Sequence, residues 1–246
     1  MRITVLGSGD AFGSGGRFST CLHLAADDGT SMLVDCAATS MTALNRTDID
    51  RNGICAILFT HFHGDHFGGL PFFVLDAQFV TRRRAPLTIA GPKGVEERAR
   101  VALEAAFPGS STAKRAFDLH FVEIAPDRPA DIGGARIDAF AMIHDERAGP
   151  CLGYRIGRDD RIFAYSGDTS WTDQLIPLSR GADALLIECY TVDRKLPNHL
   201  DYQTLSAHLH ELAARRIILT HMGASMLAWT AELPVERAFD GLVIAL

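Results

Sequence analysis

A polar stretch in the first third of the chain, LFTHFHGDHFGG, carries three histidines and one aspartate within six positions. The apolar run before it, ICAILFT, is typical of a buried strand. Alternate side chains of an extended segment share a face, so His61 and His63 can converge on one ion. A polar turn with surface histidines is the alternative, but this pattern at a strand end favours metal binding.

The second half of the stretch points away from the first. Gly64 allows a sharp turn, after which Asp65 and His66 begin a helix and face a neighbouring position. Two-metal hydrolases hold their ions about 3.5–4 Å apart, and such a split set of ligands suits that separation. The stretch therefore predicts room for two ions.

Four residues cannot complete two metal sites, so further ligands must come from elsewhere. Three candidates each follow an apolar, strand-like run: His144 ends IDAFAMIH, Asp168 ends RIFAYSGD and His221 ends RIILTH. A lone residue at a strand end is usually solvated, but together they indicate one rim where several strands terminate. Sites in αβ folds gather at such rims.

The rest of the chain alternates strand-like and helical runs without a long linker or repeat. We expect helices near 39–47, 66–81, 94–107, 172–180 and 202–214, the last with Asp201 as N-cap. We expect strands near 2–7, 21–26, 31–36, 55–60, 86–90, 117–124, 135–143, 151–157, 161–166, 184–189 and 216–220. A single α/β domain over residues 1–246, with two sheets covered by helices, is the simplest interpretation.

Composition is that of an ordinary globular protein, with 47% hydrophobic and 22% charged residues. The net charge of −6 provides no general attraction to nucleic acid, and the basic run at 82–84 is too short to reverse it. We interpret that run as a solvated helix end or loop, with a phosphate-binding patch as the alternative. Five scattered cysteines, no signal-peptide pattern and no membrane-length apolar run predict a cytoplasmic protein.

In its motifs the chain resembles the metallo-β-lactamase-fold hydrolases. The resemblance rests on THFHGDH at 60–66, His144, SGDT at 166–169 and LTHMG at 219–223, in the family's order, supported by VLGSGDAFG and MLVDC. It implies a four-layer αβ/βα sandwich of two mixed β-sheets flanked by helices, with the metals at one edge between the sheets.

The resemblance also implies a division of the ligands. His61, His63 and His144 would hold one ion, Asp65, His66 and His221 the other, and Asp168 would bridge them. Imidazole and carboxylate ligands favour Zn²⁺, although Mn²⁺ and Fe fit the same ligand types. Such a centre lowers the pKa of a shared water and produces a metal-bound hydroxide, which Asp65 would orient.

Within that superfamily the chain most resembles the ribonuclease Z branch of phosphodiesterases. The pointers are the GSGDAFGSGG opening, GPKG at 91–94, and the segments LLIECYT and PNHLDYQT. The resemblance implies that His199 is the general acid that protonates the leaving oxygen, with Glu188 as its orienting partner. A solvated histidine at a helix start is the alternative.

One departure from the tRNA-processing members bears on the substrate. Their tRNA-binding arm is inserted between the counterparts of His144 and Asp168, where this chain has only 23 residues. From this difference and the net charge of −6, we therefore expect a small phosphodiester such as a cyclic nucleotide or nucleotide derivative, and no long nucleic acid. The lack of a membrane-length apolar run predicts no membrane association. Related enzymes are often dimers, and the apolar run PFFVLDAQFV could form an interface or belong to the core, so a homodimer is possible. A lactone or thioester hydrolase with the same centre, and a metal-binding scaffold or sensor, are the alternatives. Aromatic candidates for the pocket wall are Phe12, Phe67, Phe72, Tyr190 and Trp229.

Overall fold

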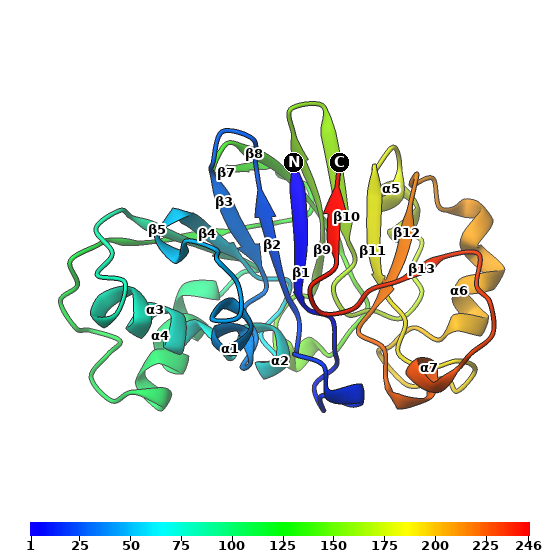
Figure 1. Cartoon of the computed structure of the whole chain (residues 1–246), viewed down its shortest axis with the longest axis horizontal. Helices are drawn as coiled ribbons and strands as arrows, with labels where there is room; N and C mark the ends of the chain where they lie inside the picture. The colour runs from blue at the N-terminus through cyan, green and yellow to red at the C-terminus, as the bar shows by residue number, and fades with distance from the viewer.

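A computed structural model describes all residues from 1 to 246. Two seven-stranded sheets face each other in the middle of the molecule, with helices on the two outer sides (Figure 1). Each sheet contains parallel and antiparallel pairs, so both are mixed. The first has the order β14-β1-β2-β3-β4-β5-β6. Its strands are β1 (Arg2–Gly7), β2 (Cys21–Ala25), β3 (Ser31–Val34), β4 (Ile54–Leu58), β5 (Leu87–Gly91), β6 (Leu119–Glu123) and β14 (Val243–Ala245).

The second sheet has the order β13-β12-β11-β10-β9-β8-β7. Its strands are β7 (Ala130–Ile132), β8 (Ala135–Ala141), β9 (Leu152–Arg158), β10 (Arg161–Tyr165), β11 (Ala184–Glu188), β12 (Ile217–Thr220) and β13 (Glu236–Arg237). Seven α-helices connect the strands: α1 (Ser40–Leu44), α2 (Gly64–Phe67), α3 (Leu70–Phe79), α4 (Val95–Ala106), α5 (Leu175–Ser179), α6 (Tyr202–His208) and α7 (Ala224–Ala228).

Three apolar layers hold the sandwich together. The central layer joins the inner faces of the two sheets, where Leu58 of β4 and Tyr154 of β9 are fully buried. A second layer packs α1, α3 and α4 on the first sheet, and a third packs α5, α6 and α7 on the second. This is the predicted four-layer αβ/βα arrangement, which is confirmed.

The strand directions bring many carboxyl ends to one rim. Strands β3 to β6 run parallel, as do β10 to β13. Strands β1 and β8 have the same sense, because each pairs antiparallel with a strand that is itself antiparallel to one of these sets. Within each sheet, the carboxyl ends of these strands therefore lie at one edge, as the sequence predicted.

The helix predicted near 66–81 is two helices, α2 and α3. The break falls at Gly69, whose backbone lies so close to Ala37 that an added Cβ would meet the Ala37 carbonyl oxygen at 2.1 Å. The Gly69 N–H donates to the Cys36 carbonyl at 2.8 Å. A contact between residues far apart in the chain, invisible to helical periodicity, causes the interruption.

Several short elements were not predicted: β7, β13, β14 and α7. They have two to five residues, too few to show a period. The predicted N-cap of α6 is confirmed, since the Asp201 carboxylate accepts a hydrogen bond from the Thr204 N–H at 2.8 Å.

A two-residue turn joins β9 to β10. Arg158 pairs with Arg161, and the two residues between them, Asp159 and Asp160, have φ angles of 51° and 60°. Two positive φ angles are typical of a type I′ hairpin turn. No arm or domain is inserted in this part of the chain.

The middle residue of the basic run at 82–84 is buried, so it belongs neither to a solvated end nor to a phosphate-binding patch. Arg83 is only 2% exposed, and its guanidinium donates to backbone carbonyls that include those of Ile54 and Pro86, both at 2.8 Å. These hydrogen bonds join the connection before β5 to the start of β4.

Helix α3 has apolar residues on opposite sides. Phe73 and Val74 are buried, whereas Phe72 and Phe79 are exposed. The homodimer suggested by this helix stays a prediction. No helix has the length and apolar character needed to cross a membrane.

Candidate metal centre

The first cluster of the rim consists of His61, His63 and His144. His61 and His63 follow β4, and His144 follows β8 on the opposite sheet. One ligand atom from each lies within 4.8 Å of the others. The approach is closest between His144 Nε2 and His63 Nδ1, which are 3.1 Å apart. Two segments separated by about eighty residues thus aim three imidazoles at one point.

The second cluster lies beside the first and consists of Asp65, His66, Asp168 and His221, with ligand atoms again within 4.8 Å of one another. Asp168 Oδ1 is 3.2 Å from His66 Nε2, and Asp65 Oδ2 is 3.2 Å from His221 Nε2. Asp168 Oδ2 also lies 3.9 Å from His144 Nε2 of the first cluster. The Asp168 carboxylate therefore stands between the two sets, as its predicted bridging role requires.

Several atoms at this centre are buried without a hydrogen-bond partner, among them His61 Nε2, His66 Nε2 and Asp168 Oδ1. Buried polar atoms are nearly always hydrogen-bonded, so several unpaired atoms at one place need an explanation. Burial and the neighbouring imidazoles lower the pKa of His61 well below its usual value, which leaves a neutral ring with a free lone pair. Convergent imidazole and carboxylate lone pairs of this kind fit divalent cations.

The charge state of Asp168 agrees with that fit. Burial alone would raise its pKa, but the nearby His221 and His66 outweigh this effect and hold the pKa well below its usual value. An ionised, buried carboxylate between two imidazole sets has two oxygens available for separate ions.

Asp35 orients a ligand of each cluster, a role that sequence reasoning missed. It is fully buried at the end of β3, and its Oδ2 accepts from His66 Nδ1 at 2.7 Å. The same carboxylate accepts from the Thr60 hydroxyl, which lies 3.0 Å from His61 Nδ1. Each histidine therefore keeps Nε2 free to face the centre. The sequence feature that could have revealed this role is the aspartate of MLVDC, which follows a strand that lies beside β4.

A backbone carbonyl orients His144, and two residues near it have unusual backbone angles. His144 Nδ1 donates to the carbonyl of Asn198 at 2.7 Å, which turns Nε2 toward the centre. Asn198 and His221 have φ angles of 68° and 54°. Residues other than glycine rarely adopt this region, and such strain clusters at functional sites.

His199 stands next to the centre on the segment after β11. Its Nδ1 lies 3.2 Å from both oxygens of Glu188, a fully buried residue that also accepts from the Thr169 N–H at 2.6 Å. Burial lowers the pKa of His199, but the hydrogen bond and charge of Glu188 outweigh it and raise the pKa to about 9. The structure thus brings the predicted pair together, and a ring nitrogen of His199 lies within 4.8 Å of ligand atoms of His144 and Asp168.

A cavity of about 520 Å³ opens over the centre. His63, Asp65, Asp168, His199 and His221 form its polar end. Its outer wall is formed by Ala11, Phe12, Tyr190, Leu196 and Pro197. Of the aromatic candidates, Phe12 and Tyr190 line this cavity, whereas Phe67, Phe72 and Trp229 do not.

In the glycine-rich loop after β1, several amides are already paired within the protein. The N–H groups of Phe12 and Ser14 both donate to Asp10 Oδ1, at 3.1 and 2.9 Å. The N–H of Ser8 donates to Asp240 at 2.9 Å. The loop instead presents Phe12, which is 83% exposed, at the cavity mouth.

Comparison with known proteins places this chain in a family. The family model described as "Anti-Pycsar protein Apyc1" matches residues 1–242. The chain belongs to this family. Among curated relatives, ribonuclease Z of Lachnoclostridium phytofermentans is 32% identical over 157 residues, which cover 63% of this chain and 48% of the relative. Ribonuclease Z of Limosilactobacillus fermentum is 27% identical over 279 aligned positions, covering 91% and 88%.

The chain spans about half the length of the first two curated relatives it matches. The alignment with the Limosilactobacillus protein is longer than the 246 residues of this chain, so that relative contains residues with no counterpart here.

Solved structures share the fold. The metallo-β-lactamase fold protein YhfI from Bacillus subtilis superimposes with a TM-score of 0.79 at 21% identity, covering 99% of this chain and 98% of that one. Human tRNase Z, short form (ELAC1), has a TM-score of 0.78 at 23% identity, covering 100% and 99%. The prediction of a ribonuclease Z-like member of the metallo-β-lactamase superfamily is confirmed. The histidine–aspartate cluster of this chain has the ligand types that bind divalent metal ions.

Proposed function

We propose that this chain is a phosphodiesterase with a dinuclear centre, most suited to Zn²⁺, that hydrolyses a small phosphodiester such as a cyclic nucleotide or nucleotide derivative. The observation that carries the proposal is the placement of Asp168 between two sets of ligands at the floor of a cavity whose wall includes His199. A pair of divalent ions bound there would supply hydroxide at neutral pH and polarise the phosphoryl oxygen.

Two side chains would act on the nucleophile and on the leaving group. Asp65, with a carboxylate oxygen near His221 and His66, would orient the nucleophile. His199 would protonate the leaving oxygen, since Glu188 holds its Nδ1 and leaves the other nitrogen for the substrate. The raised pKa of His199 keeps it protonated at neutral pH, which is the state that a general acid needs.

The cavity favours a small substrate with one phosphate. No lysine or arginine lines it, so a chain of phosphates would find no side-chain cation beyond the histidines. Its volume lies within the range of small-molecule sites, about 300–1,000 Å³. The apolar outer wall suits an organic group attached to the phosphate.

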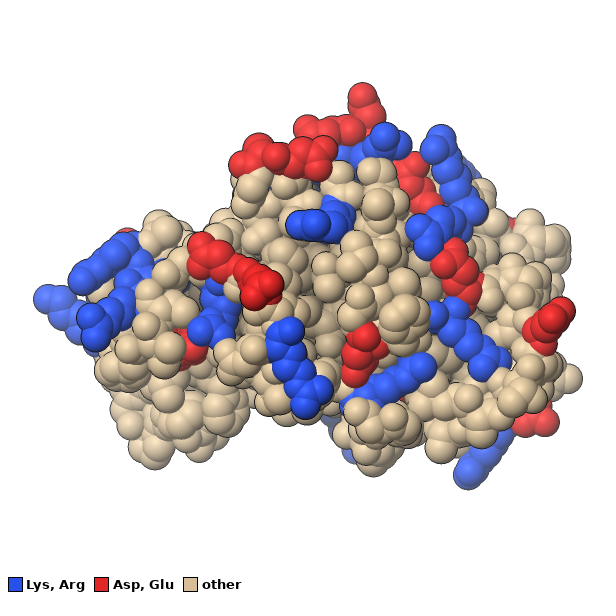
Figure 2. Space-filling view, viewed as in Figure 1, with Lys and Arg blue, Asp and Glu red and all other residues tan.

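Long nucleic acid fits this surface poorly. The β9–β10 turn has only two residues where an arm would be inserted. On the face shown in Figure 2, basic side chains occur in small groups and singly between acidic ones, and they form no tract across the face. Strong phosphate-backbone binding needs many clustered cations.

A panel of substrates tests the proposal. The zinc-loaded protein should hydrolyse 3′,5′-cyclic nucleotides and bis(p-nitrophenyl) phosphate, and the Asp168→Ala variant should not. Turnover of acyl-lactones or thioesters alone would replace the phosphodiesterase with the carbon-ester alternative. Metal binding without turnover of any member would point to a scaffold or sensor.

A further inference from the structure

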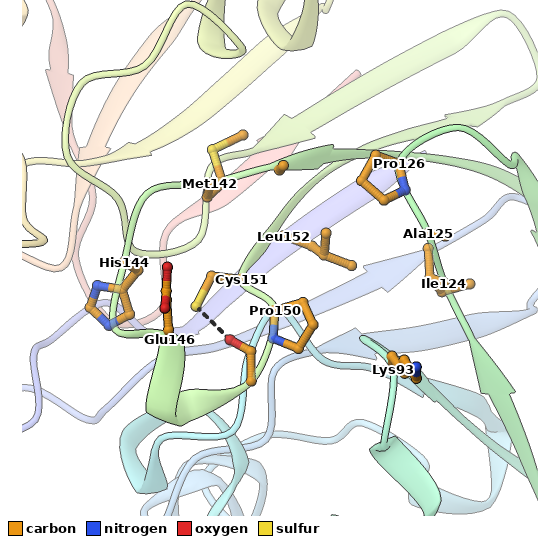
Figure 3. Close-up of a pocket in the computed structure, with 12 residues that line it drawn as sticks. Lys93, Ile124, Ala125, Pro126, Met142, His144, Glu146, Pro150, Cys151 and Leu152 are labelled. Atoms are coloured by element: carbon orange, nitrogen blue, oxygen red, sulfur yellow. Dashed lines mark hydrogen bonds between the residues drawn. The ribbon is translucent and has the colours of Figure 1, made fainter.

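A second cavity, of about 460 Å³, has His144 in its wall (Figure 3). It shares no lining residue with the cavity over the metal centre. The turn after β5, the end of β6 and the connection from β8 to β9 form its walls. Its surface is largely apolar and is provided by Ile124, Ala125, Pro126, Ala141, Met142 and Leu152.

Two formal charges face this second cavity. Lys93 and Glu146 lie on opposite sides of it, with the apolar surface between them (Figure 3). A negative group is attracted to the Lys93 ammonium and repelled by the Glu146 carboxylate, so a ligand with one anionic end has one preferred orientation. Lys93 is the one lysine or arginine among the lining residues, and a small molecule with an apolar body and a single negative charge can place that charge at Lys93 and its body against the apolar surface.

One wall of the second cavity is hydrogen-bonded to the segment that carries His61 and His63. The Phe62 N–H donates to the Ala148 carbonyl at 3.0 Å, and the Leu152 N–H donates to the Thr60 carbonyl at 3.0 Å. Gly149 packs so tightly on Phe62 that an added Cβ would lie 2.8 Å from the ring. A ligand that shifts the 145–150 loop must therefore also shift the segment that carries His61 and His63.

We propose that the second cavity binds a small apolar monoanion, and that its occupancy changes the metal affinity of the adjacent centre through His144 and the 145–150 loop. Such coupling is reciprocal, so metal must change the affinity for the anion by the same factor, typically about 5-fold or more. The inference concerns a site separate from the catalytic pocket and does not depend on which bond that pocket cleaves.

The probe is 1-anilinonaphthalene-8-sulfonate, an apolar monoanion whose fluorescence reports binding. It is titrated into the full chain, metal-free and zinc-loaded. We expect saturable binding whose Kd differs by about 5-fold or more between the two forms. Ala125→Trp and Ala141→Trp, at exposed positions in the cavity wall, should each abolish that binding.

Three further variants serve as comparisons. Ala106→Trp places the same side chain at an exposed position outside the cavity and should leave binding unchanged. Lys93→Gln should weaken binding, and Glu146→Gln should not. Thermal melts verify that each variant is folded. Undiminished binding in both folded tryptophan-filled variants, or an identical Kd with and without zinc, would overturn the proposal.

Discussion

At the scale of single residues, the centre depends on groups that never touch an ion. Asp35 illustrates this, because one buried carboxylate sets the orientation of His66 directly and of His61 through Thr60. Partners of this kind fix both the tautomer and the direction of the ligand lone pair.

We therefore expect Asp35→Asn to weaken metal binding by about 10–100-fold, because the neutral amide loses the charge that holds the His66 Nδ1–H. Competition with a chelator measures the change. The exposed Asp127→Asn is the matched control and should bind metal like the parent. Equal affinity in all three proteins would show that Asp35 has no orienting role.

His199 yields a second residue-scale prediction. His199→Gln should lower kcat on a cyclic nucleotide by about 10²–10⁴-fold while metal content stays unchanged, because the leaving oxygen loses its proton donor. The loss should be much smaller on bis(p-nitrophenyl) phosphate, whose leaving group needs little protonation. An equal loss on both substrates, or loss of metal, would assign His199 to another role.

At the scale of elements, the sequence predicted most of what positions the centre. Strong strand patterns located β4, β8, β10 and β12, and the polar residues after these strands were expected at one rim. The pairing of Asp35 with His66 was not predicted, because strand order decides which ends are neighbours and no local pattern states that order. The same reason explains the missed β7 and β14, which exist through pairing with β8 and β1.

The break between α2 and α3 is an element-scale feature that a mutation can test. Gly69→Ala should lower the free energy of unfolding by about 1–3 kcal/mol, because the new methyl group meets the Ala37 carbonyl and forces the backbone to move. Gly53→Ala, whose Cβ would meet its nearest neighbour at 3.7 Å, is the control. Chemical denaturation measures both, and equal stability would mean that the close approach imposes no constraint.

At the scale of the whole molecule, each half of the chain supplies most of one sheet, and the metal centre needs residues from both halves. His61, His63, Asp65 and His66 come from the first half, and His144, Asp168 and His221 from the second. Strand β14 returns to pair with β1 and carries the last part of the chain to the first sheet.

We propose that residues 1–246 form a single cooperative domain, because the two sheets share the central apolar layer. Calorimetry should show one transition whose calorimetric and van't Hoff enthalpies agree. Two separable transitions would instead divide the chain into independent units.

The most direct test of the central claim is the number of metal ions per chain, measured together with phosphodiesterase activity as zinc is added to the metal-free protein. The two ligand sets meeting at Asp168 predict two ions per chain, with hydrolysis of a cyclic nucleotide rising as the second ion binds and disappearing on chelation. Saturation at one ion with full activity, or hydrolysis that persists without metal, would contradict the account.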